Sequence, residues 1–351
     1  MRAAVLVAPG EIALRDCPTP RPAPGEAEIA VAYVGVCGSD QARFAGRMAC
    51  RGPVIFGHEF SGRVRSVRTA PQGLAPGQAV AVAPLLNCRT CAVCRAGREH
   101  LCASRRLFGT HVDGAMRETV CMPADRVVPL PPHVSLREGA LLEPLAVAVH
   151  AAELAGPLDG AEVAVLGAGA IGMLIAQVAR ALGACRVLVI DIKTDRLRLA
   201  AHLGFDAANS ASADLPAIVL EHTDGRGAGV VFEATGSPAV ASHFAGMVTP
   251  GGAVVVAGRM HEPARLDLDA LLLKEARLLT SRYFTLADFR KALDLVTTGR
   301  VATAPLIQAE VPLECLGDNR GGVVMAAAGQ VLRLLVAVGG EAPSASGRGE
   351  P

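Results

Sequence analysis

The sequence has few aromatic residues and lacks any long hydrophobic run. Tryptophan is absent, and aromatic residues make up only 3% of the 351 positions. This scarcity argues against a pocket for a flat aromatic substrate. No apolar segment approaches the roughly 20 residues that a membrane-spanning helix requires. We therefore expect no membrane partner.

The chain also lacks an excess of charge of either sign. Its formal net charge is +1, charged residues make up 19% of the positions, and no basic run is present. We therefore expect no nucleic-acid partner, because such a partner is held by a basic patch. Apolar residues (51%) combined with 38 glycines and 23 prolines are typical of a compact, turn-rich globular protein. The length suggests about two domains.

The N-terminus lacks the pattern of a secretory signal, because residues 1–10 read as a strand that ends in a turn. We expect a cytoplasmic protein whose ten cysteines serve as metal ligands or core residues and not as disulfides. Four of them crowd into one short stretch. The others are scattered, at Cys17, Cys37, Cys50, Cys121, Cys185 and Cys315.

The pattern of predicted secondary structure changes near residue 150. Residues 1–150 contain short strands broken by proline and glycine, such as 28–34 and 78–82, which is typical of a β-rich, irregular domain. In residues 151–285 strands alternate with helices, which predicts an α/β domain with a parallel, doubly wound sheet. The strands predicted there are 161–166, 186–190, 230–233 and 253–257, and the first helix is 171–182.

The remainder of the chain is expected to return to the first domain. Residues 286–338 complete that domain in this interpretation, and they begin with an amphipathic helix at 288–298. The segment 339–351 is small, polar and rich in residues that break regular structure, so we expect it to be disordered.

A glycine-rich motif lies between a predicted strand and a predicted helix. Gly167 permits a tight turn, Gly169 lets the backbone approach a pyrophosphate, and Gly172 lets the helix pack closely on the strand. Asp191, at the end of the next strand, would accept hydrogen bonds from the adenosine ribose and repel a 2′-phosphate, which favours NAD over NADP. The alternative is an ordinary turn with a solvated Asp191.

Four cysteines within fifteen residues supply the thiols of a closed, structural zinc site. They are Cys88, Cys91, Cys94 and Cys102. An iron–sulfur cluster is the rival interpretation, because ferredoxins also space cysteines by two residues. The longer gap before Cys102 and the lack of a following proline weaken it. Unliganded thiols are the remaining alternative.

A second metal site is predicted from two glycine-framed segments. Cys37 offers a thiolate, His58 an imidazole and Glu59 a carboxylate, which leaves an open position for a substrate oxygen. Asp40 could orient His58, and Ser39 could accept a proton from the bound alcohol. Taken singly, Cys37 is more often a core thiol and His58 a satisfied buried histidine.

With these motifs the chain resembles the zinc-containing medium-chain dehydrogenase/reductase superfamily, and most nearly its polyol, threonine and sugar-acid dehydrogenase branch. The resemblance runs from residue 1 to about residue 299. It implies a GroES-like β-rich catalytic domain split around a Rossmann domain, with the active site in the cleft between them. It also implies two zinc ions per chain and a homo-oligomer, either a dimer or a tetramer. The segments that carry it are 35–40, 57–59, 88–102, 143–147 and the Gly167 motif with Asp191 and Arg196.

The resemblance also assigns roles to single residues. Cys37, His58 and Glu59 ligate the catalytic zinc, and Glu143 is an exchangeable fourth ligand. The alternative for Glu143 is a carboxylate that stabilises the start of a helix. Arg196 would contact the adenosine, or else lie on a surface helix. The cofactor-binding residues so implied are Gly167, Gly169, Ile171, Gly172, Asp191 and Arg196.

Several positions depart from the family pattern. Ala42 stands where relatives often have a histidine, and Arg333 where they commonly have lysine. Glycines in residues 315–322 fit the usual terminal helix poorly. Arg282 resembles the sugar-acid branch and could pair with a substrate carboxylate, although an arginine at a domain boundary can also serve structure or cofactor binding.

These inferences predict an enzyme that transfers a hydride from a secondary alcohol of a small polyol or sugar-acid-like substrate to NAD. An aminocyclitol or threonine-type amino alcohol is the alternative substrate within the same family. A catalytically inactive NAD- and zinc-binding protein is an alternative of a different class, and the intact Cys37, His58 and Glu59 set argues against it. A zinc-ribbon nucleic-acid binder is disfavoured by the near-neutral charge.

Overall fold

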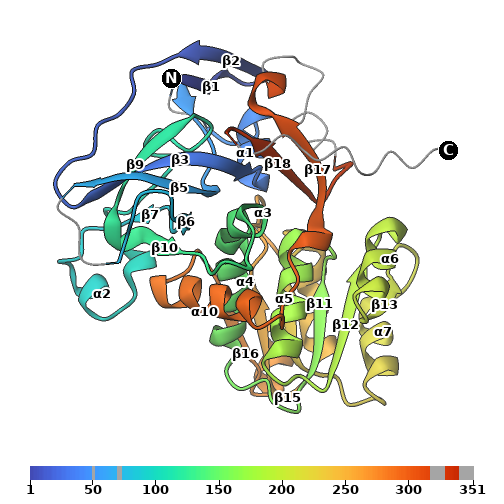
Figure 1. Ribbon diagram of the computed structural model, residues 1–351. Coiled ribbons are helices and arrows are strands. Elements are labelled where there is room, and N and C mark those ends of the chain that lie inside the picture. Colours follow the sequence, from blue (N-terminus) through green and yellow to red (C-terminus); the bar gives the residue numbers. More distant parts are fainter. Residues whose placement is uncertain (50–51, 69–72, 317–328, 340–351) are drawn as a thin grey trace. The chain divides into compact units, whose positions relative to one another are not determined.

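The computed structural model describes residues 1–49, 52–68, 73–316 and 329–339 (Figure 1). Contacts divide the chain into two units. Unit 1 comprises Met1–Cys94, Leu101–Glu143 and Ala304–Pro351, and unit 2 comprises Arg95–His100 and Pro144–Thr303. Every helix in the described part of the chain is too short or too polar to span a bilayer.

Unit 1 is built on β-sheets. Its main sheet has the strand order β10-β6-β5-β3-β18-β17, with β9 also paired to β3. In β3 the first residues alternate between buried and half-buried, because successive side chains of a strand point to opposite faces. The main-sheet strands are β3 (Glu26–Gly35), β5 (Glu59–Arg68), β6 (Ala79–Val82), β9 (Thr119–Pro123), β10 (Val127–Pro129), β17 (Ile307–Pro312) and β18 (Arg333–Ala337).

Two smaller sheets and short helices complete unit 1. The smaller sheets have the orders β2-β1-β4 and β7-β8. Their strands are β1 (Arg2–Ala8), β2 (Glu11–Asp16), β4 (Val54–Ile55), β7 (Leu85–Leu86) and β8 (Arg106–Leu107). The helices are α1 (Gly38–Phe44), α2 (Ala92–Arg95), α3 (Leu136–Ala140) and the start of α4 (Leu142–Ala155), and Cys315 lies in the short 3-10 turn Leu313–Leu316.

Unit 2 contains a six-stranded sheet in which every pair of neighbours is parallel, in the order β13-β12-β11-β14-β15-β16 (Figure 1). The central strands are continuous apolar runs, as expected when helices cover both faces. The strands are β11 (Glu162–Leu166), β12 (Arg186–Asp191), β13 (Asp206–Asn209), β14 (Ala228–Glu233), β15 (Val248–Val256) and β16 (Arg277–Thr280). The helices are α5 (Ala170–Ala181), α6 (Thr194–His202), α7 (Leu215–His222), α8 (Phe244–Met247), α9 (Leu268–Leu273) and α10 (Leu286–Thr297).

The predicted strands and helices are confirmed, with shifted boundaries. The strand predicted at 253–257 begins earlier, at Val248, because the Pro-Gly-Gly turn inside it does not end the ladder. Helix α10 stays with unit 2, and the chain returns to unit 1 only at Ala304 instead of residue 286. Two hydrogen bonds account for this difference: Asp288 binds His150 at 2.9 Å, and Gln177 accepts from the Ala302 amide at 2.9 Å.

Two expectations fall outside the described residues. The first is the disorder predicted for 339–351, of which only Gly339 is described. The second is the poor fit to a helix at 315–322, of which only residues 315 and 316 are described.

Candidate active site and metal centres

The three ligands predicted for the catalytic metal lie together in unit 1. Cys37 follows β3 and precedes α1, while His58 and Glu59 enter β5. Strands β3 and β5 pair antiparallel, with Gly35 opposite Glu59, so the two segments are neighbours. One ligand atom of each residue lies within 4.8 Å of the other two. His58 and Glu59 are buried, at 3% and 0% exposure.

Two glycines make room for this arrangement. A Cβ on Gly35 would lie 2.4 Å from Oε2 of Glu59. Gly57 has a φ of +90°, which L side chains rarely adopt, and its Cβ would also meet Val34 at 2.8 Å and Met116 at 2.9 Å. The turn that aims His58 and Glu59 therefore requires glycine.

Arg333 of β18 holds the carboxylate of Glu59. Its Nη1 donates to both carboxylate oxygens at 2.8 Å, and both side chains are buried. In the sequence Arg333 stands out only as a departure from lysine. The partner was missed because the two residues are 274 positions apart.

The electrostatics of the group suit a cation. Burial, and then the neighbouring Glu59 and Asp40, raise the pKa of the Cys37 thiol to about 12. Burial raises the pKa of Glu143 to about 8, and Glu59 and Cys37 push it in the same direction. Several buried acids thus oppose one another's ionisation, a conflict that a divalent cation would relieve. A thiolate, an imidazole and carboxylates are the donors that zinc accepts, so the residues present fit this metal.

Residues of helix α1 surround the group. The Ser39 side chain hydrogen-bonds with that of Cys37. Asp40 accepts from the Cys37 amide at 3.2 Å, and its Oδ1 lies 3.8 Å from Nδ1 of His58, beyond hydrogen-bonding distance. The orienting role predicted for Asp40 therefore stays a prediction. Ala42 is buried beside them, where relatives often carry histidine.

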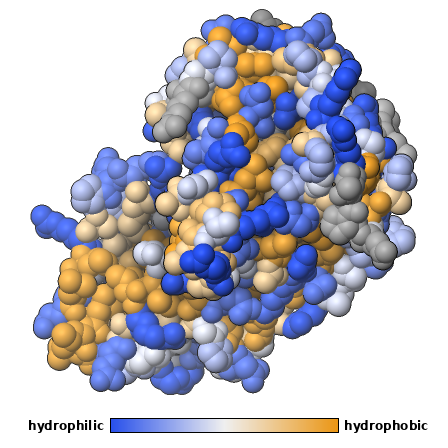
Figure 2. Space-filling model, turned by 90° about the vertical axis from the view of Figure 1, so that its left-hand side faces the viewer, coloured by the Kyte–Doolittle hydropathy of each residue, from blue (hydrophilic) through white to orange (hydrophobic). Residues whose placement is uncertain are grey.

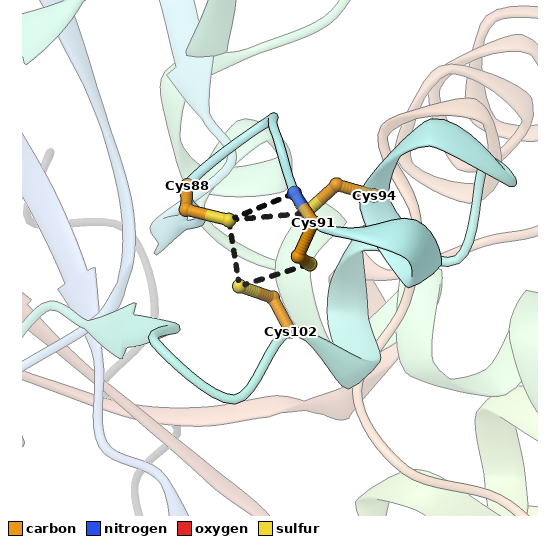
Figure 3. A group of neighbouring side chains, drawn as sticks. All are labelled: Cys88, Cys91, Cys94 and Cys102. Carbon is orange, nitrogen blue, oxygen red and sulfur yellow. Dashed lines mark hydrogen bonds between the residues drawn. The ribbon is translucent and has the colours of Figure 1, made fainter.

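The four cysteines predicted to bind the structural zinc form a second group, also in unit 1 (Figure 3). They are Cys88, Cys91, Cys94 and Cys102. Sγ–Sγ distances are 3.5 Å for Cys88–Cys102 and 3.9 Å for both Cys88–Cys94 and Cys91–Cys102. A zinc–sulfur bond of about 2.3 Å gives a tetrahedron with edges of about 3.8 Å. The sulfurs are therefore spaced for a single ion, and this spacing is too narrow to enclose a multi-iron cluster.

A hydrogen-bonded turn prepares this second group. Backbone hydrogen bonds from Thr90 and Cys91 lower the pKa of Cys88 to about 6, which favours the thiolate. Arg89 adopts a φ of +61° in the turn, and its guanidinium pairs with Asp125 at 2.8 Å.

The glycine-rich motif of unit 2 joins β11 to α5. Gly167 has a φ of +100°, and a Cβ on Gly172 would lie 1.8 Å from the carbonyl oxygen of Gly167. Gly169 caps α5, and a Cβ there would meet nothing within 4 Å. Ile171 lies in the first turn of α5. Both the tight turn and the close helix packing therefore need glycine, whereas Gly169 leaves open space.

Asp191, at the end of β12, ties this motif to the neighbouring loop. Its carboxylate accepts from the amides of Ala168 at 2.7 Å and Lys193 at 2.8 Å. Arg196 of α6 lies 3.7 Å from it. Arg282, also in unit 2, is exposed and its guanidinium lies 4.9 Å from the ring centre of Tyr283.

Known proteins share both units. Residues 23–132 match the family model of an alcohol dehydrogenase GroES-like domain, and residues 170–298 match that of a zinc-binding dehydrogenase. A 2-dehydro-3-deoxy-L-galactonate 5-dehydrogenase of Pseudoalteromonas atlantica is 36% identical over 300 residues, which cover 85% of this chain and 87% of that protein. The chain belongs to the zinc-dependent medium-chain dehydrogenase/reductase family. This dehydrogenase is thus a GroES-like domain combined with a Rossmann domain, as its sequence predicts, and an oxidoreductase acting on CH–OH groups.

Further relatives of this dehydrogenase cover nearly the whole chain. D-xylulose reductase A of Aspergillus niger is 32% identical over 324 residues, 90% of each protein. The crystal structure of galactitol-1-phosphate dehydrogenase from Escherichia coli has a TM-score of 0.90 and 28% identity, and the match covers 96% of this chain and 100% of that one.

Proposed function

We propose that this dehydrogenase oxidises a secondary hydroxyl group of a small polyol or sugar acid to a ketone, with NAD as the hydride acceptor. The observation that carries the proposal is the convergence of Cys37, His58 and Glu59 on one point in unit 1. The 2-dehydro-3-deoxy-L-galactonate 5-dehydrogenase and the D-xylulose reductase among the relatives support the substrate class.

The residues of unit 1 have separate roles in the proposed reaction. Cys37, His58 and Glu59 would hold a zinc ion, with Glu143 as an exchangeable fourth ligand. Zinc held there would supply Lewis acidity that lowers the pKa of the substrate hydroxyl. Ser39 would take up the hydroxyl proton, and its hydrogen bond to Cys37 supports this role. Cys88, Cys91, Cys94 and Cys102 would hold the second, structural zinc of the chain.

Unit 2 would bind the cofactor. The N-terminus of α5 presents unpaired amides to a pyrophosphate, with Gly169 leaving room for it. The Asp191 carboxylate would accept from a ribose hydroxyl and repel a 2′-phosphate, with Arg196 beside it. NAD held by these residues would supply the hydride acceptor. Measuring the rate of substrate oxidation with NAD and with NADP tests this preference. We expect a clearly lower kcat/KM for NADP.

The test is a screen for NAD reduction with sugar alcohols, aldonates, threonine, butanediol and aminocyclitols. Cys37→Ala should lower the turnover of the best substrate by roughly 10³-fold or more and leave NAD affinity unchanged. The matched control, Cys185→Ala, removes an exposed thiol of unit 2 and should be silent. Full activity of the Cys37 variant would remove this site from the reaction.

We further propose that the protein forms a homo-oligomer, a dimer or a tetramer, and works in the cytoplasm. Leu268, Leu272 and Leu273 of α9 are 65–76% exposed, and β16, which follows α9, is an edge strand of its sheet. Figure 2 shows broad hydrophobic areas on one face of the molecule. Such exposed apolar surface marks an association face. Light scattering should show an oligomer for the wild type. Replacing Leu272 and Leu273 with glutamate should dissociate it, and an unchanged mass in this variant would place the contact elsewhere.

A further inference from the structure

We propose that Arg43 forms an anion-binding subsite of the candidate active site, and that the physiological substrate carries a carboxylate or a phosphate. The inference rests on the proposed function, because it names the substrate class of the same site.

Arg43 is buried, and in the described part of the chain its Nη1 lacks a hydrogen-bond partner. Its side chain is 6% exposed. The ion pair that the structure gives it is with Oδ1 of Asp40, at 3.5 Å. A guanidinium carries five N–H donors, and burying it with so few contacts is costly. A site that maintains such a side chain in the free protein is prepared for an anion.

Asp40 cannot satisfy this guanidinium alone. Its other oxygen, Oδ2, already accepts from the Cys37 amide, and its Oδ1 also faces Nδ1 of His58 at 3.8 Å. The nearby Glu59 is held by Arg333 instead. Among the described residues, Nη1 of Arg43 is thus left for a ligand that comes from outside the protein.

Helix α1 places Arg43 close to the reacting position. Ser39 and Arg43 are four residues apart, so they lie on one face of the helix with about 5–6 Å between their Cβ atoms. Ser39 contacts Cys37, which places Arg43 one turn further along from the candidate metal ligands. A substrate that presents a hydroxyl to those ligands would place an anionic group a few bonds away at Arg43. A sugar acid or a sugar phosphate has this form.

Arg43 and the expected anion match in chemistry. Guanidinium pairs with carboxylate and phosphate through two parallel hydrogen bonds. Arg282, which the sequence suggested for this role, is exposed and contacts Tyr283 in unit 2. Arg43 lies in unit 1 with the ligand group itself.

The experiment compares three substrates of equal carbon number: an aldonate, a polyol phosphate and the uncharged polyol. Each is assayed with the zinc-loaded wild-type protein and with Arg43→Gln, Arg43→Lys and Arg47→Gln. Arg47 is the matched control, because it is an exposed arginine four residues further on. Arg43→Gln should raise KM for the preferred anionic substrate about 10- to 100-fold, with less than about a threefold change for the polyol. Arg43→Lys should recover part of the loss, and Arg47→Gln should match the wild type.

Whichever anion the wild type prefers identifies the source of the charge. A wild-type preference for the uncharged polyol, or an equal loss on all three substrates in Arg43→Gln, would overturn the inference while leaving the proposed function intact. Binding is measured separately, as the rise in melting temperature of the metal-free protein with added aldonate or polyol phosphate. This rise should disappear in Arg43→Gln. If no substrate class is oxidised, the proposed function fails and the melting series still decides the role of Arg43: no rise in the wild type, or an equal rise in Arg43→Gln, overturns it.

Discussion

Arg333 donates through a single nitrogen, Nη1, to both carboxylate oxygens of Glu59 at 2.8 Å, and neither side chain is more than 4% exposed. The pair connects β18 to the start of β5 and fixes the direction of the Glu59 carboxylate beside Cys37 and His58. Buried ion pairs of this kind add little net stability, but removing one partner is costly because the other charge is left unpaired.

Arg333→Gln should therefore lower the free energy of unfolding of the protein by about 3–5 kcal/mol, measured by urea denaturation. Arg333→Lys keeps the positive charge and should lose clearly less. Combining Arg333→Gln with Glu59→Gln removes both charges and should recover part of the stability. A loss below about 1 kcal/mol in the single variant would mean that Glu59 does not depend on Arg333.

Glu143 should make the metal-free protein less stable as the pH rises. Burial raises its pKa to about 8, whereas a glutamate in an unfolded chain titrates near about 4.3. Between these values the folded chain holds a proton that the unfolded chain has lost, so the free energy of unfolding falls with increasing pH, by at most about 1.4 kcal/mol per pH unit.

The measurement is urea unfolding with a chelator at pH 5.5, 6.5 and 7.5. Glu143→Gln should remove this part of the slope, and the exposed Glu11→Gln should keep it. Identical slopes in the wild type and Glu143→Gln would show that the carboxyl is ionised throughout.

The two glycines Gly169 and Gly172 should respond differently to alanine. In Gly172→Ala the new Cβ would collide with the Gly167 carbonyl, so we expect a loss of about 1–3 kcal/mol or more in stability. In Gly169→Ala the Cβ meets only open space, so stability should be retained while the Kd for NAD rises at least about tenfold. Calorimetry gives both quantities. Unchanged NAD affinity in Gly169→Ala would place the pyrophosphate elsewhere.

Metal analysis should find two zinc ions per wild-type chain. Cys91→Ser removes a ligand of the four-cysteine group and should leave about one, with the melting temperature lowered and the Cys37 group still loaded. Cys121→Ser, a cysteine outside both groups, should keep two. Iron in place of zinc, or one metal in the wild type, would contradict the two-site interpretation.

Sequence reasoning performed best where the signal is local. The spacing of Cys88, Cys91 and Cys94 and of Gly167, Gly169 and Gly172 encodes ligand number and turn geometry within a few residues, and the structure brings both sets together. The strands of unit 2 were found because they are apolar runs between turn residues.

It performed less well where the signal depends on distant packing. Neither the Glu59–Arg333 contact nor the unpaired Nη1 of Arg43 in the described structure leaves a local pattern, since both depend on which side chains the fold buries next to each other. The place where the chain returns to unit 1 was misjudged because α10 reads as an ordinary amphipathic helix, and its contacts with unit 2, such as Asp288–His150 and Lys291–Glu153, join residues 138 positions apart.

The discontinuity of unit 1 constrains how this protein matures. Cys37, His58 and Glu59 are synthesised early. Arg333, which pairs with Glu59, and its strand β18 are synthesised only after the whole of unit 2. Unit 2, almost uninterrupted along the chain, can close its sheet while the ribosome is still working. We therefore expect the Cys37 group to reach its final geometry only after β18 has joined the sheet, late in the folding of the chain.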